Sequence, residues 1–510
     1  MEAIDCGWLS ILPPIIAIVL ALLTKEVISS LVIGILAGGL IYTGFNVVGA
    51  VDVTFNVMAE KMGGNSFILL FLALLGALVV VVTKAGGSRA YGQWAVTKLK
   101  SRTGAQLATS ALGALIFIDD YFNCLTVGTV MRPVTDKHRI SRAKLAYLID
   151  STAAPICIIA PVSSWAAAVA GFMTDAGIED GLGTFVQTIP YNLYAILTIL
   201  MILVLVFTKM DFGAMRRFER KAQEQGDLDA QEGAIESTEE FDGTKISDKG
   251  RVFDLVIPIV ALIVFSILGM LYVGGLFTGG AADIAEAFAN TDASAGLTLG
   301  GFAALVVAFL LFVPRRVLSF RDFMEGITQG VKSMVPAFII LILAWTISGM
   351  CRDLLSTGEF VGNLVQSSNI SLQLLPAIVF VVAGFLAFAM GTSWGTFGIL
   401  IPIVVIICGT NSPYLIPSLA ATLAGAVYGD HCSPISDTTI LSSTGAGCNH
   451  IDHVSSQMGY ATLVAVICFI GYLVAGLTEN LFITLGVSVV LLGAVLAVAF
   501  YLTRRREARG

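Results

Sequence analysis

Acidic side chains interrupt segments of this chain that are otherwise strongly apolar. The stretch "FIDDYFNC" places Asp119 and Asp120 side by side, and Asp150, Asp430 and Asp437 lie in two further apolar segments. A charge at the centre of a lipid bilayer costs at least about 2.5–3.5 kcal/mol, so acids in such segments are rare and usually functional. Because a carboxylate at membrane depth can bind a proton or a metal cation, these five residues are the first candidates for function.

The composition places these acids in a membrane protein. The chain has 510 residues, of which 56% are hydrophobic and only 13% are charged, and its mean hydropathy is +0.87. A water-soluble domain carries about 25% charged residues. Apolar stretches long enough to cross a bilayer as helices, about 17–25 residues each, recur along the whole length. The chain is therefore predicted to be an all-α polytopic membrane protein, with a first crossing helix near 8–23 rather than a cleaved signal peptide.

Lysine and arginine residues mark the cytoplasmic side, because short cytoplasmic loops carry an excess of them. They cluster at 84–102, 132–144, 209–251 and 315–332, and in the tail "RRREARG". The loops "MTDAGIEDG" and "GGAADIAEAFANTDAS" contain acids but no lysine or arginine. We therefore expect a multi-pass protein of the inner (cytoplasmic) cell membrane, with these two loops and the N-terminus outside and the C-terminus in the cytoplasm.

Two basic clusters lie too close together for the segment between them to cross the membrane twice. Only 29 residues separate Arg102 from Arg132, whereas two crossings need about 40. The segment is therefore predicted to enter from the cytoplasm, turn within the membrane and return, with "FIDDYFN" near its tip. Irregular backbone at that depth occurs only where it is buried in protein or lines a wet cavity. The acids at this tip are thus expected to be within reach of ions.

The two halves of the chain contain matching segments in the same order. Residues 67–87 align without gaps on 338–358, and "PICIIAPVSS" at 155–164 matches "PISDTTILSS" at 434–443. The first half is predicted to cross the membrane five times, an odd number, so the second half starts from the opposite side. This pattern predicts two inverted repeats, the architecture of many secondary transporters.

The repeat divides the chain into four predicted parts. The first repeat spans 1–207, the polar cytoplasmic linker 208–250, the second repeat 251–478, and an extra helix with a basic cytoplasmic tail 479–510. Each repeat is predicted to contain one re-entrant hairpin, at about 104–131 and 372–408, and one broken helix, at about 143–170 and 415–443. The predicted total is about 11 crossings.

Both predicted broken helices contain a proline close to serine and threonine residues, in "LIDSTAAPIC" and "GDHCSPISDTT". Proline removes a backbone donor and breaks the helix, and freed carbonyls and helix ends then bind ions or charged groups. Because oxygen ligands suit a hard cation, the breaks and the hairpin tips are predicted to bind sodium. The candidate residues are Asp119, Asp120, Asn123, Thr392, Ser393 and Thr396 at the tips, and Asp150, Ser151, Thr152, Asp430, Ser433, Ser436, Asp437 and Thr438 at the breaks. The predicted sodium ligands are Asp120, Asn123, Ser433 and Asp437.

Several of these residues have a simpler alternative role. A serine or threonine in a membrane helix often bonds only the carbonyl one turn back, or joins two helices. Asp119 would equally serve to cap the hairpin turn. His431 either titrates or bonds its neighbour, and the pair of His450 and His453 is a weak metal motif, because three-residue spacing alone is not specific.

The segments "FIDDYFNCLTVGTVMRPVTDKHRISRAKLAYLIDSTAAPICIIAPVSSW" and "YGDHCSPISDTTILSSTGAGCNHIDHVSSQMGYA" closely resemble the NhaC family of sodium/proton antiporters. The resemblance covers nearly the whole chain, and "GDHCSPISDTT" is its specific motif. It implies secondary transport through a site near the membrane midplane, a homodimer, and a transport domain that moves against a fixed scaffold like an elevator. Carried over to this sequence, it supports Asp119, Asp120 and Asn123 at the first tip, and Asp430, Ser433, Ser436, Asp437 and Thr438 at the second break.

Three functions remain open on the sequence alone. The first is exchange of sodium for protons, since acids in the membrane can bind either ion in turn. The second is sodium-coupled transport of a small organic solute, an amino acid or a carboxylate (including malate/lactate-type exchange). Four aromatic residues near the breaks would line its pocket, or would equally serve only in packing: Tyr121, Phe122, Trp165 and Trp394. The third, an intramembrane aspartyl protease using Asp150 and Asp430, is disfavoured by the repeat and the Ser/Thr/Pro breaks, so no enzyme activity is expected. The expected partners are sodium, protons and the lipid bilayer, with no nucleic acid and no cofactor beyond the coupling sodium ion.

Overall fold

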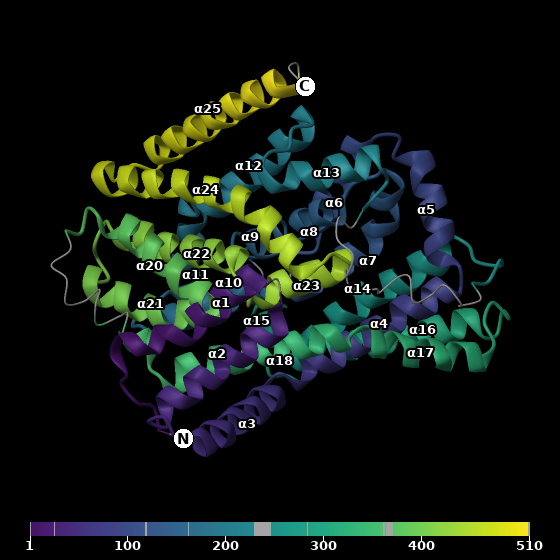
Figure 1. Cartoon of the computed structure of the whole chain (residues 1–510), viewed down its shortest axis with the longest axis horizontal. Coiled ribbons are helices and arrows are strands. Elements are labelled where there is room, and N and C mark those ends of the chain that lie inside the picture. The colour runs from purple at the N-terminus through teal and green to yellow at the C-terminus, as the bar shows by residue number, and fades with distance from the viewer. Residues whose placement is uncertain are drawn as a thin grey trace.

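The computed structural model describes residues 2–24, 26–117, 120–161, 163–228, 246–282, 284–360, 363 and 371–507. In this part of the chain all regular secondary structure is helical and no strand occurs (Figure 1). Seven of the described helices are long and apolar enough to cross a membrane, or up to eight if the bent pair of α2 (Val27–Tyr42) and α3 (Val47–Gly64) is one span. The prediction of an all-α polytopic membrane protein is confirmed. The other expected crossings fall on shorter or broken helices, so the total of about 11 stays a prediction.

The N-terminal helices include two that the sequence analysis did not predict, α3 and α5 (Gly87–Lys98). After a 3-10 turn, η1 (Gly7–Ile11), they are α1 (Leu12–Thr24), α2, α3, α4 (Ser66–Lys84) and α5. The chain bends by 117° between α2 and α3, where the Asn46 side chain caps α3 by accepting a hydrogen bond from Gly49 N. Helix α3 was not predicted, because Asp52, Glu60 and Lys61 interrupt its apolar residues.

The segment of the predicted first hairpin folds into two helices, α6 (Arg102–Leu115) and α7 (Asp120–Lys137). Helices α6 and α7 pack against each other, and Asp119, predicted near the tip of the hairpin, lies outside the described residues. The segment of the first predicted broken helix forms α8 (Arg142–Asp150), α9 (Ala154–Cys157) and α10 (Ser164–Asp175). The first interruption therefore follows Asp150 directly, at the Ser-Thr pair.

The start of the polar linker is helical and packed. The helices after α10 are α11 (Gly181–Thr188), η2 (Ile189–Tyr191), α12 (Leu193–Thr208) and α13 (Gly213–Glu224). On α13, Glu219 is only 2% exposed, accepts a hydrogen bond from Ser141 N and pairs with Arg102. Because a buried carboxylate needs such partners, this pairing fixes α13 against the start of the first hairpin. Residues 229–245 of the linker lie outside the described part of the chain.

The second half repeats the order of a hairpin followed by a broken helix. It begins with α14 (Phe253–Val273), α15 (Ile284–Ala289), α16 (Ala293–Phe312), α17 (Phe320–Ser333), α18 (Val335–Gly349) and a π-helical turn, η4 (Met350–Leu354). The segment of the second predicted hairpin forms α20 (Leu375–Met390) and α21 (Ser393–Cys408), and the second broken helix forms α22 (Leu415–Cys432) and α23 (Asp437–Ala446). The long helices α24 (His450–Thr478) and α25 (Leu481–Glu507) end the described chain.

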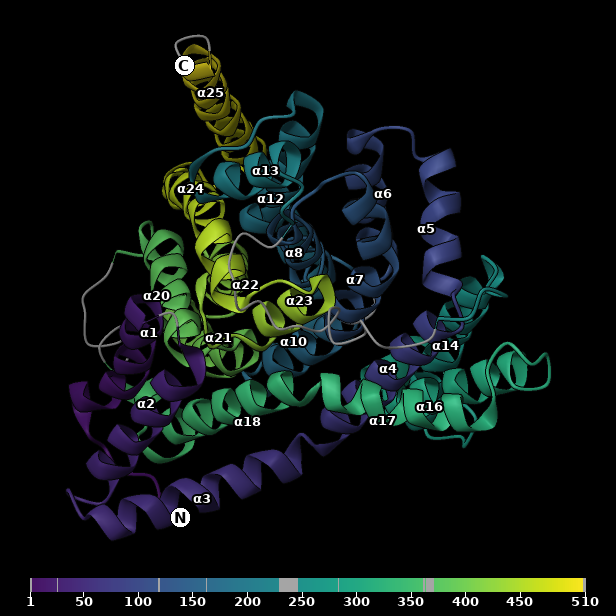
Figure 2. The ribbon, with the colours of Figure 1, turned by 45° about the vertical axis from the view of Figure 1, so that its right-hand side comes forward.

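Helices from both halves meet at the hairpins. Helix α23 packs against α7 and α8, and a Cβ on Gly128 of α7 would collide with the backbone of Gly445 on α23. On the other side, α4 packs against α16 and α17, where a Cβ on Gly76 would lie 2.5 Å from Gly330 O. Figure 2 shows α3, α4, α17 and α18 along one side of the molecule, with α23 and the first hairpin facing them. Glycines thus permit the close helix contacts, as is common in membrane proteins.

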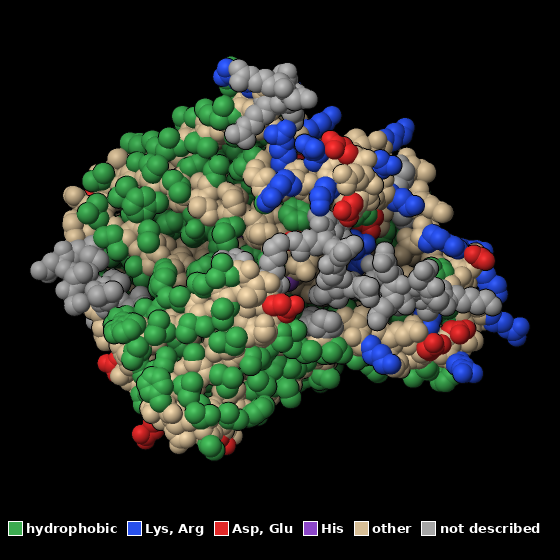
Figure 3. Space-filling view, in the orientation of Figure 1, with side chains coloured by type: hydrophobic (Ala, Val, Ile, Leu, Met, Phe, Trp, Pro, Cys, Tyr) green, Lys and Arg blue, Asp and Glu red, His purple; other side chains and the backbone are tan. Residues whose placement is uncertain are grey.

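Charge is distributed unevenly over the surface. On the face in Figure 3, Lys and Arg side chains gather towards the right, over the region where Figure 1 places α5, α13 and α17, whereas green apolar side chains cover the left and the bottom. Exposed apolar side chains such as Phe482, Val490 and Phe302 belong to helices long enough to span a membrane. An apolar surface of this kind fits a lipid environment.

Candidate functional site

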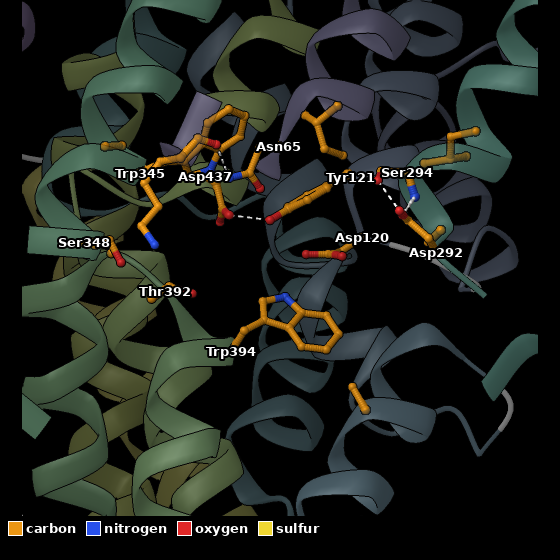
Figure 4. Close-up of a pocket in the computed structure, with 18 of the residues that line it drawn as sticks. Asn65, Asp120, Tyr121, Asp292, Ser294, Trp345, Ser348, Thr392, Trp394 and Asp437 are labelled. Atoms are coloured by element: carbon orange, nitrogen blue, oxygen red, sulfur yellow. Dashed lines mark hydrogen bonds between the residues drawn. The ribbon is translucent and has the colours of Figure 1, made fainter. Parts of the chain in front are cut away.

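One cavity brings the two hairpins together with helices of the opposite side. It has a volume of about 460 Å³ and is partly open, within the range typical of small-molecule sites. Its wall includes Asp120 and Tyr121 at the start of α7, Thr392 and Trp394 at the second hairpin tip, and Asp437 at the start of α23 (Figure 4). Helices α4, α16 and α18 supply the facing wall. Three of the predicted site residues therefore share one cavity.

Asp437 joins the two halves of the chain at this cavity. It lies in the first turn of α23, and its Oδ1 accepts a hydrogen bond from Thr438 N at 2.9 Å. Its Oδ2 accepts a hydrogen bond from the Tyr121 hydroxyl of the first hairpin. The carboxylate is 7% exposed. Because the N-terminal end of a helix favours negative charge, the start of α23 is a suitable place for a cation-binding carboxylate.

Asp120 occupies the equivalent place on α7, in its first turn. Its Oδ1 accepts a hydrogen bond from the Trp165 indole nitrogen at 2.9 Å. The Trp165 ring in turn lies against Trp394, with ring centroids 5.0 Å apart. Thus α10 positions the acid of the first hairpin, and the same tryptophan contacts the tip of the second hairpin.

Asn123 fastens the first hairpin rather than lining the cavity. Its Nδ2 lies 2.7 Å from Gly113 O, 2.9 Å from Ile116 O and 3.0 Å from Thr152 O. These carbonyls belong to the end of α6 and to the break after α8, so the side chain ties the hairpin to the broken helix. Its buried Oδ1 has no hydrogen-bond partner among the described residues. Thr152 bonds Leu148 O one turn back, the simpler role open to such residues.

The second hairpin is fastened to its broken helix in a comparable way. Ser393 Oγ donates to Asp430 Oδ2 at 2.8 Å, and Ser433 Oγ donates to Phe388 O at 2.8 Å. Ser433 does not belong to the cavity wall, so two of the four predicted sodium ligands, Asn123 and Ser433, lie away from it. Thr396 bonds Thr392 O. These contacts position the second tip and the break as one unit.

The remaining predicted serine and threonine residues surround the breaks. Ser436 caps α23 by accepting from Thr439 N, and its hydroxyl lies 3.0 Å from that of Thr438. Ser151 is buried immediately after α8. None of these three side chains belongs to the cavity wall.

Asp150 lies in a closed polar cluster instead of the cavity. The side chain is fully buried, and its oxygens accept hydrogen bonds from Ser442 Oγ at 3.2 Å, His453 Nε2 at 3.2 Å and Gln457 Nε2 at 2.5 Å. His431 Nε2 lies 3.9 Å from Asp150 Oδ1. All four neighbours come from the second half, so Asp150 joins the first broken helix to α22, α23 and α24. No group of three or more His, Cys, Asp or Glu side chains suited to a metal ion occurs among the residues that the structure describes.

The facing wall contains charged residues that the motifs did not indicate. Lys61 of α3 and Arg352 of η4 both line the cavity, and both pair with Asp353, at 2.5 Å and 2.7 Å. Asn65 and Trp345 line the cavity beside them. The sequence could have indicated these two residues, because Lys61 and Arg352 lie outside all the basic clusters that mark the cytoplasmic side.

Comparison with known proteins agrees with the resemblance seen in the motifs. A sequence profile of the Na+/H+ antiporter family matches residues 156–477. The chain is 41% identical over 499 residues to an uncharacterized protein of Haemophilus influenzae, covering 94% of this chain and 93% of that protein. It is 28% identical over 207 residues to the malate-2H+/Na+-lactate antiporter of Bacillus subtilis, covering 35% of this chain and 42% of that protein. It is also 23% identical over 418 residues to the putative amino acid transporter YuiF of Bacillus subtilis, covering 78% and 84%.

Proposed function

Because this chain belongs to the Na+/H+ antiporter family, it is a secondary transporter, and we propose that it exchanges sodium ions for protons across the cytoplasmic membrane. The observation that carries the proposal is the pair of carboxylates, Asp120 and Asp437, on the wall of one partly open cavity. They come from different halves of the chain, and each lies in the first turn of a helix. A proton and a sodium ion compete for such carboxylates, and this competition is the basis of exchange.

The proposed exchange uses the carboxylates as sodium ligands and proton acceptors in turn. Sodium prefers oxygen ligands, like other hard cations, and the Tyr121 and Thr392 hydroxyls lie on the same wall. Asn123 and Ser433, predicted as ligands, are assigned to holding the two tips in place, since their side chains bond backbone carbonyls. Removal of sodium allows a proton to neutralise the carboxylate, and the neutral site then returns across the membrane.

The orientation of the chain follows the distribution of basic residues. We propose that the N-terminus lies outside and the C-terminus inside, and that the two halves are inverted repeats. We further propose that a transport domain moves against a fixed scaffold, like an elevator, within a homodimer. The cavity would then open outwards, since Lys61 and Asn65 follow the second expected crossing and Asp292 belongs to an expected external loop. Cysteines introduced at Gly177 and Asp292 should react with an impermeant thiol reagent from outside, and one at Lys245 only from inside.

The decisive experiment is transport by the purified protein in proteoliposomes that contain a pH-sensitive dye. Adding sodium outside should drive protons out and raise the internal pH, whereas potassium should have little effect. Asp437→Asn should remove the response, and Asp52→Asn, an exposed acid on α3, should retain it. A wild-type protein that binds sodium but gives no sodium-dependent pH change, with or without added solute, would refute the exchange.

The volume of the cavity favours a second candidate, sodium-coupled transport of a small organic solute. A volume of about 460 Å³ greatly exceeds the space that a single water molecule occupies, about 30 Å³, and hence that of a sodium ion. Two similar proteins carry names that state an organic substrate, malate and lactate in one and amino acids in the other. In the same liposomes, this candidate predicts that labelled solute accumulates only when a sodium gradient is present.

A further inference from the structure

We propose that the cavity binds a small zwitterion, a solute that carries both a carboxylate and an ammonium group, as an α-amino acid does. The inference extends the second candidate function and names its substrate class. It starts from the charged residues of the cavity wall, because charge of both signs lines the same cavity. The cations Lys61 and Arg352 come from α3 and η4, and the acids Asp120 and Asp437 come from α7 and α23.

In the cationic part of the wall, a glycine of α18, Gly349, makes room for the Lys61 side chain. The Lys61 side chain crosses α18 at Gly349, and a Cβ at that position would collide with Lys61 Cε. The lysine side chain is only 15% exposed, and its ammonium group pairs with Asp353 at 2.5 Å. The absence of a side chain at Gly349 therefore lets a lysine reach the cavity from a neighbouring helix.

Among the described residues, Lys61 and Arg352 share one acid, Asp353, whose side chain is 39% exposed. Arg352 Nε also pairs with Asp353, at 2.7 Å. Lys61 has a further contact with Glu60 at 3.3 Å, but Glu60 is 65% exposed, and an exposed pair of this kind contributes little. The guanidinium of an arginine presents a planar set of donors that matches a carboxylate. This part of the wall is therefore suited to the carboxylate of a solute.

The acidic part of the wall supplies the complementary charge. Asp120 and Asp437 line the cavity at the starts of α7 and α23; Figure 4 shows Asp437 beside the Tyr121 hydroxyl and Asp120 between Tyr121 and Trp394. Asp292 also lines the cavity, but its carboxylate caps α16 by accepting from Ser294 N and Ala295 N. A cap of this kind is a structural role. Asp120 and Asp437 remain as the partners of an ammonium group or of sodium.

The sign of the charges selects among solutes of similar size. A dicarboxylate would place its second negative charge near the acids, and a diamine would place a positive charge near Lys61 and Arg352. A zwitterion has one favourable partner for each charge, and charge-assisted hydrogen bonds are the stronger ones. The rings of Trp345, Trp394 and Phe288, which also line the cavity, provide apolar surface for a side chain of the solute.

The first test is thermal unfolding of the purified protein in sodium buffer with a panel of solutes. A ligand bound by the folded state raises the unfolding midpoint. At millimolar concentration, at least one of the twenty L-amino acids should raise it. The amide of that amino acid, which lacks the carboxylate, and its N-acetyl derivative, which lacks the ammonium group, should not. Equal stabilisation by the N-acetyl derivative or by malate, or no stabilisation by any amino acid, would overturn the proposal.

The second test removes the cations one at a time. Arg352→Gln and Lys61→Gln should each weaken binding of the stabilising amino acid at least tenfold, while stabilisation by sodium alone is kept. Gly349→Ala retains both charges but displaces Lys61, so it should reproduce the Lys61→Gln effect. Arg220→Gln and Lys332→Gln, on exposed surfaces of α13 and α17, are the matched controls.

The two proposals fail in different ways. If Arg352→Gln binds the amino acid as the wild type does, the zwitterion site is wrong, whatever the protein does with sodium. If sodium alone produces no pH change in liposomes but the amino acid binds and is accumulated, the exchange proposal is wrong and the zwitterion site stands. If Arg352→Gln cannot be purified, the comparison of the amino acid with its amide and its N-acetyl derivative on the wild-type protein still tests the zwitterion site.

Discussion

The two helix breaks of this protein hold acids in opposite surroundings. In the first break, Asp150 is fully buried and accepts hydrogen bonds from three side chains of the other half of the chain. In the second break, Asp437 lines an open cavity and accepts a hydrogen bond from Tyr121 of the first hairpin. Both acids were predicted to bind ions for the same reason, their place at membrane depth. The difference indicates that a buried acid near a helix break has one of two roles. It either links the two halves of the chain through hydrogen bonds or binds a ligand.

Asp430, the acid at the end of α22 before the second break, shows how far the surroundings of the two breaks differ. Its side chain accepts a hydrogen bond from Ser393 of the second hairpin, whereas the described hydrogen-bond partners of Asp150 lie on α23 and α24. Asp430 thus couples a broken helix to its own hairpin, and Asp150 couples a broken helix to the other half of the chain. If a transport domain moves against a scaffold, the first broken helix and the parts of α23 and α24 bonded to Asp150 must move as one body.

The largest expected effect is the loss of stability in Asp150→Ala. Removing the carboxylate takes the acceptor of the buried His453 Nε2, whereas Gln457 keeps His431 O and Ser442 keeps Cys124 Sγ as an acceptor. An unsatisfied buried group costs about 1–3 kcal/mol, and breaking a buried pair costs more. We expect a total of about 3–5 kcal/mol, measured as a lower midpoint of thermal unfolding. Asp150→Asn keeps a carbonyl acceptor and should lose less. A variant with wild-type stability and no transport would show instead that Asp150 is a binding group.

Asp437→Asn should give the opposite pattern, with transport lost and stability kept. The amide retains the shape of the side chain but has no charge to hold sodium. Sodium binding should weaken roughly 100-fold, equivalent to about 3 kcal/mol, as measured by the sodium concentration that half-saturates thermal stabilisation. Asp52→Asn is the matched control on α3. Normal sodium binding in Asp437→Asn would remove the distinction between the two breaks.

The contrast between the breaks also explains which features the sequence revealed. The hairpins and breaks could be located from charge spacing, proline positions and the internal repeat, because these are local signals in the chain. Partners such as Gln457 for Asp150, or Tyr121 for Asp437, could not be assigned, because they lie about 300 residues away along the chain and only packing brings them together. Lys61 was missed for the same reason, since its approach to the cavity depends on a glycine of another helix, Gly349.

A smaller effect is expected from Tyr121→Phe, which removes the hydrogen bond to Asp437 and little else. That bond stabilises the ionised carboxylate by about 1 kcal/mol, so without it a proton competes more effectively with sodium. Sodium affinity should fall about fivefold at neutral pH, and the pH that gives half-maximal sodium binding should rise. The measurement is sodium-dependent thermal stabilisation across a pH series. An unchanged pH series would mean that the hydroxyl only fills space between the hairpin and α23.

The smallest effects should come from removing one hydroxyl beside each acid. Ser393→Ala removes the hydroxyl that bonds Asp430, and Ser442→Ala removes one of three donors to Asp150. Because Asp150 keeps His453 and Gln457 as donors, Ser442→Ala should lower stability by no more than about 0.5 kcal/mol, whereas Ser393→Ala should cost about 1 kcal/mol. Since Ser393 lies at the hairpin tip, its loss should also loosen the tip and weaken sodium binding two- to threefold, an effect of about 0.5 kcal/mol. Ser442→Ala should leave sodium binding unchanged. The stability of each variant and its sodium affinity both come from one set of thermal unfolding curves recorded over a range of sodium concentrations. If Ser442→Ala weakens sodium binding as much as Ser393→Ala does, the closed cluster around Asp150 is coupled to the cavity, and the two breaks form a single site.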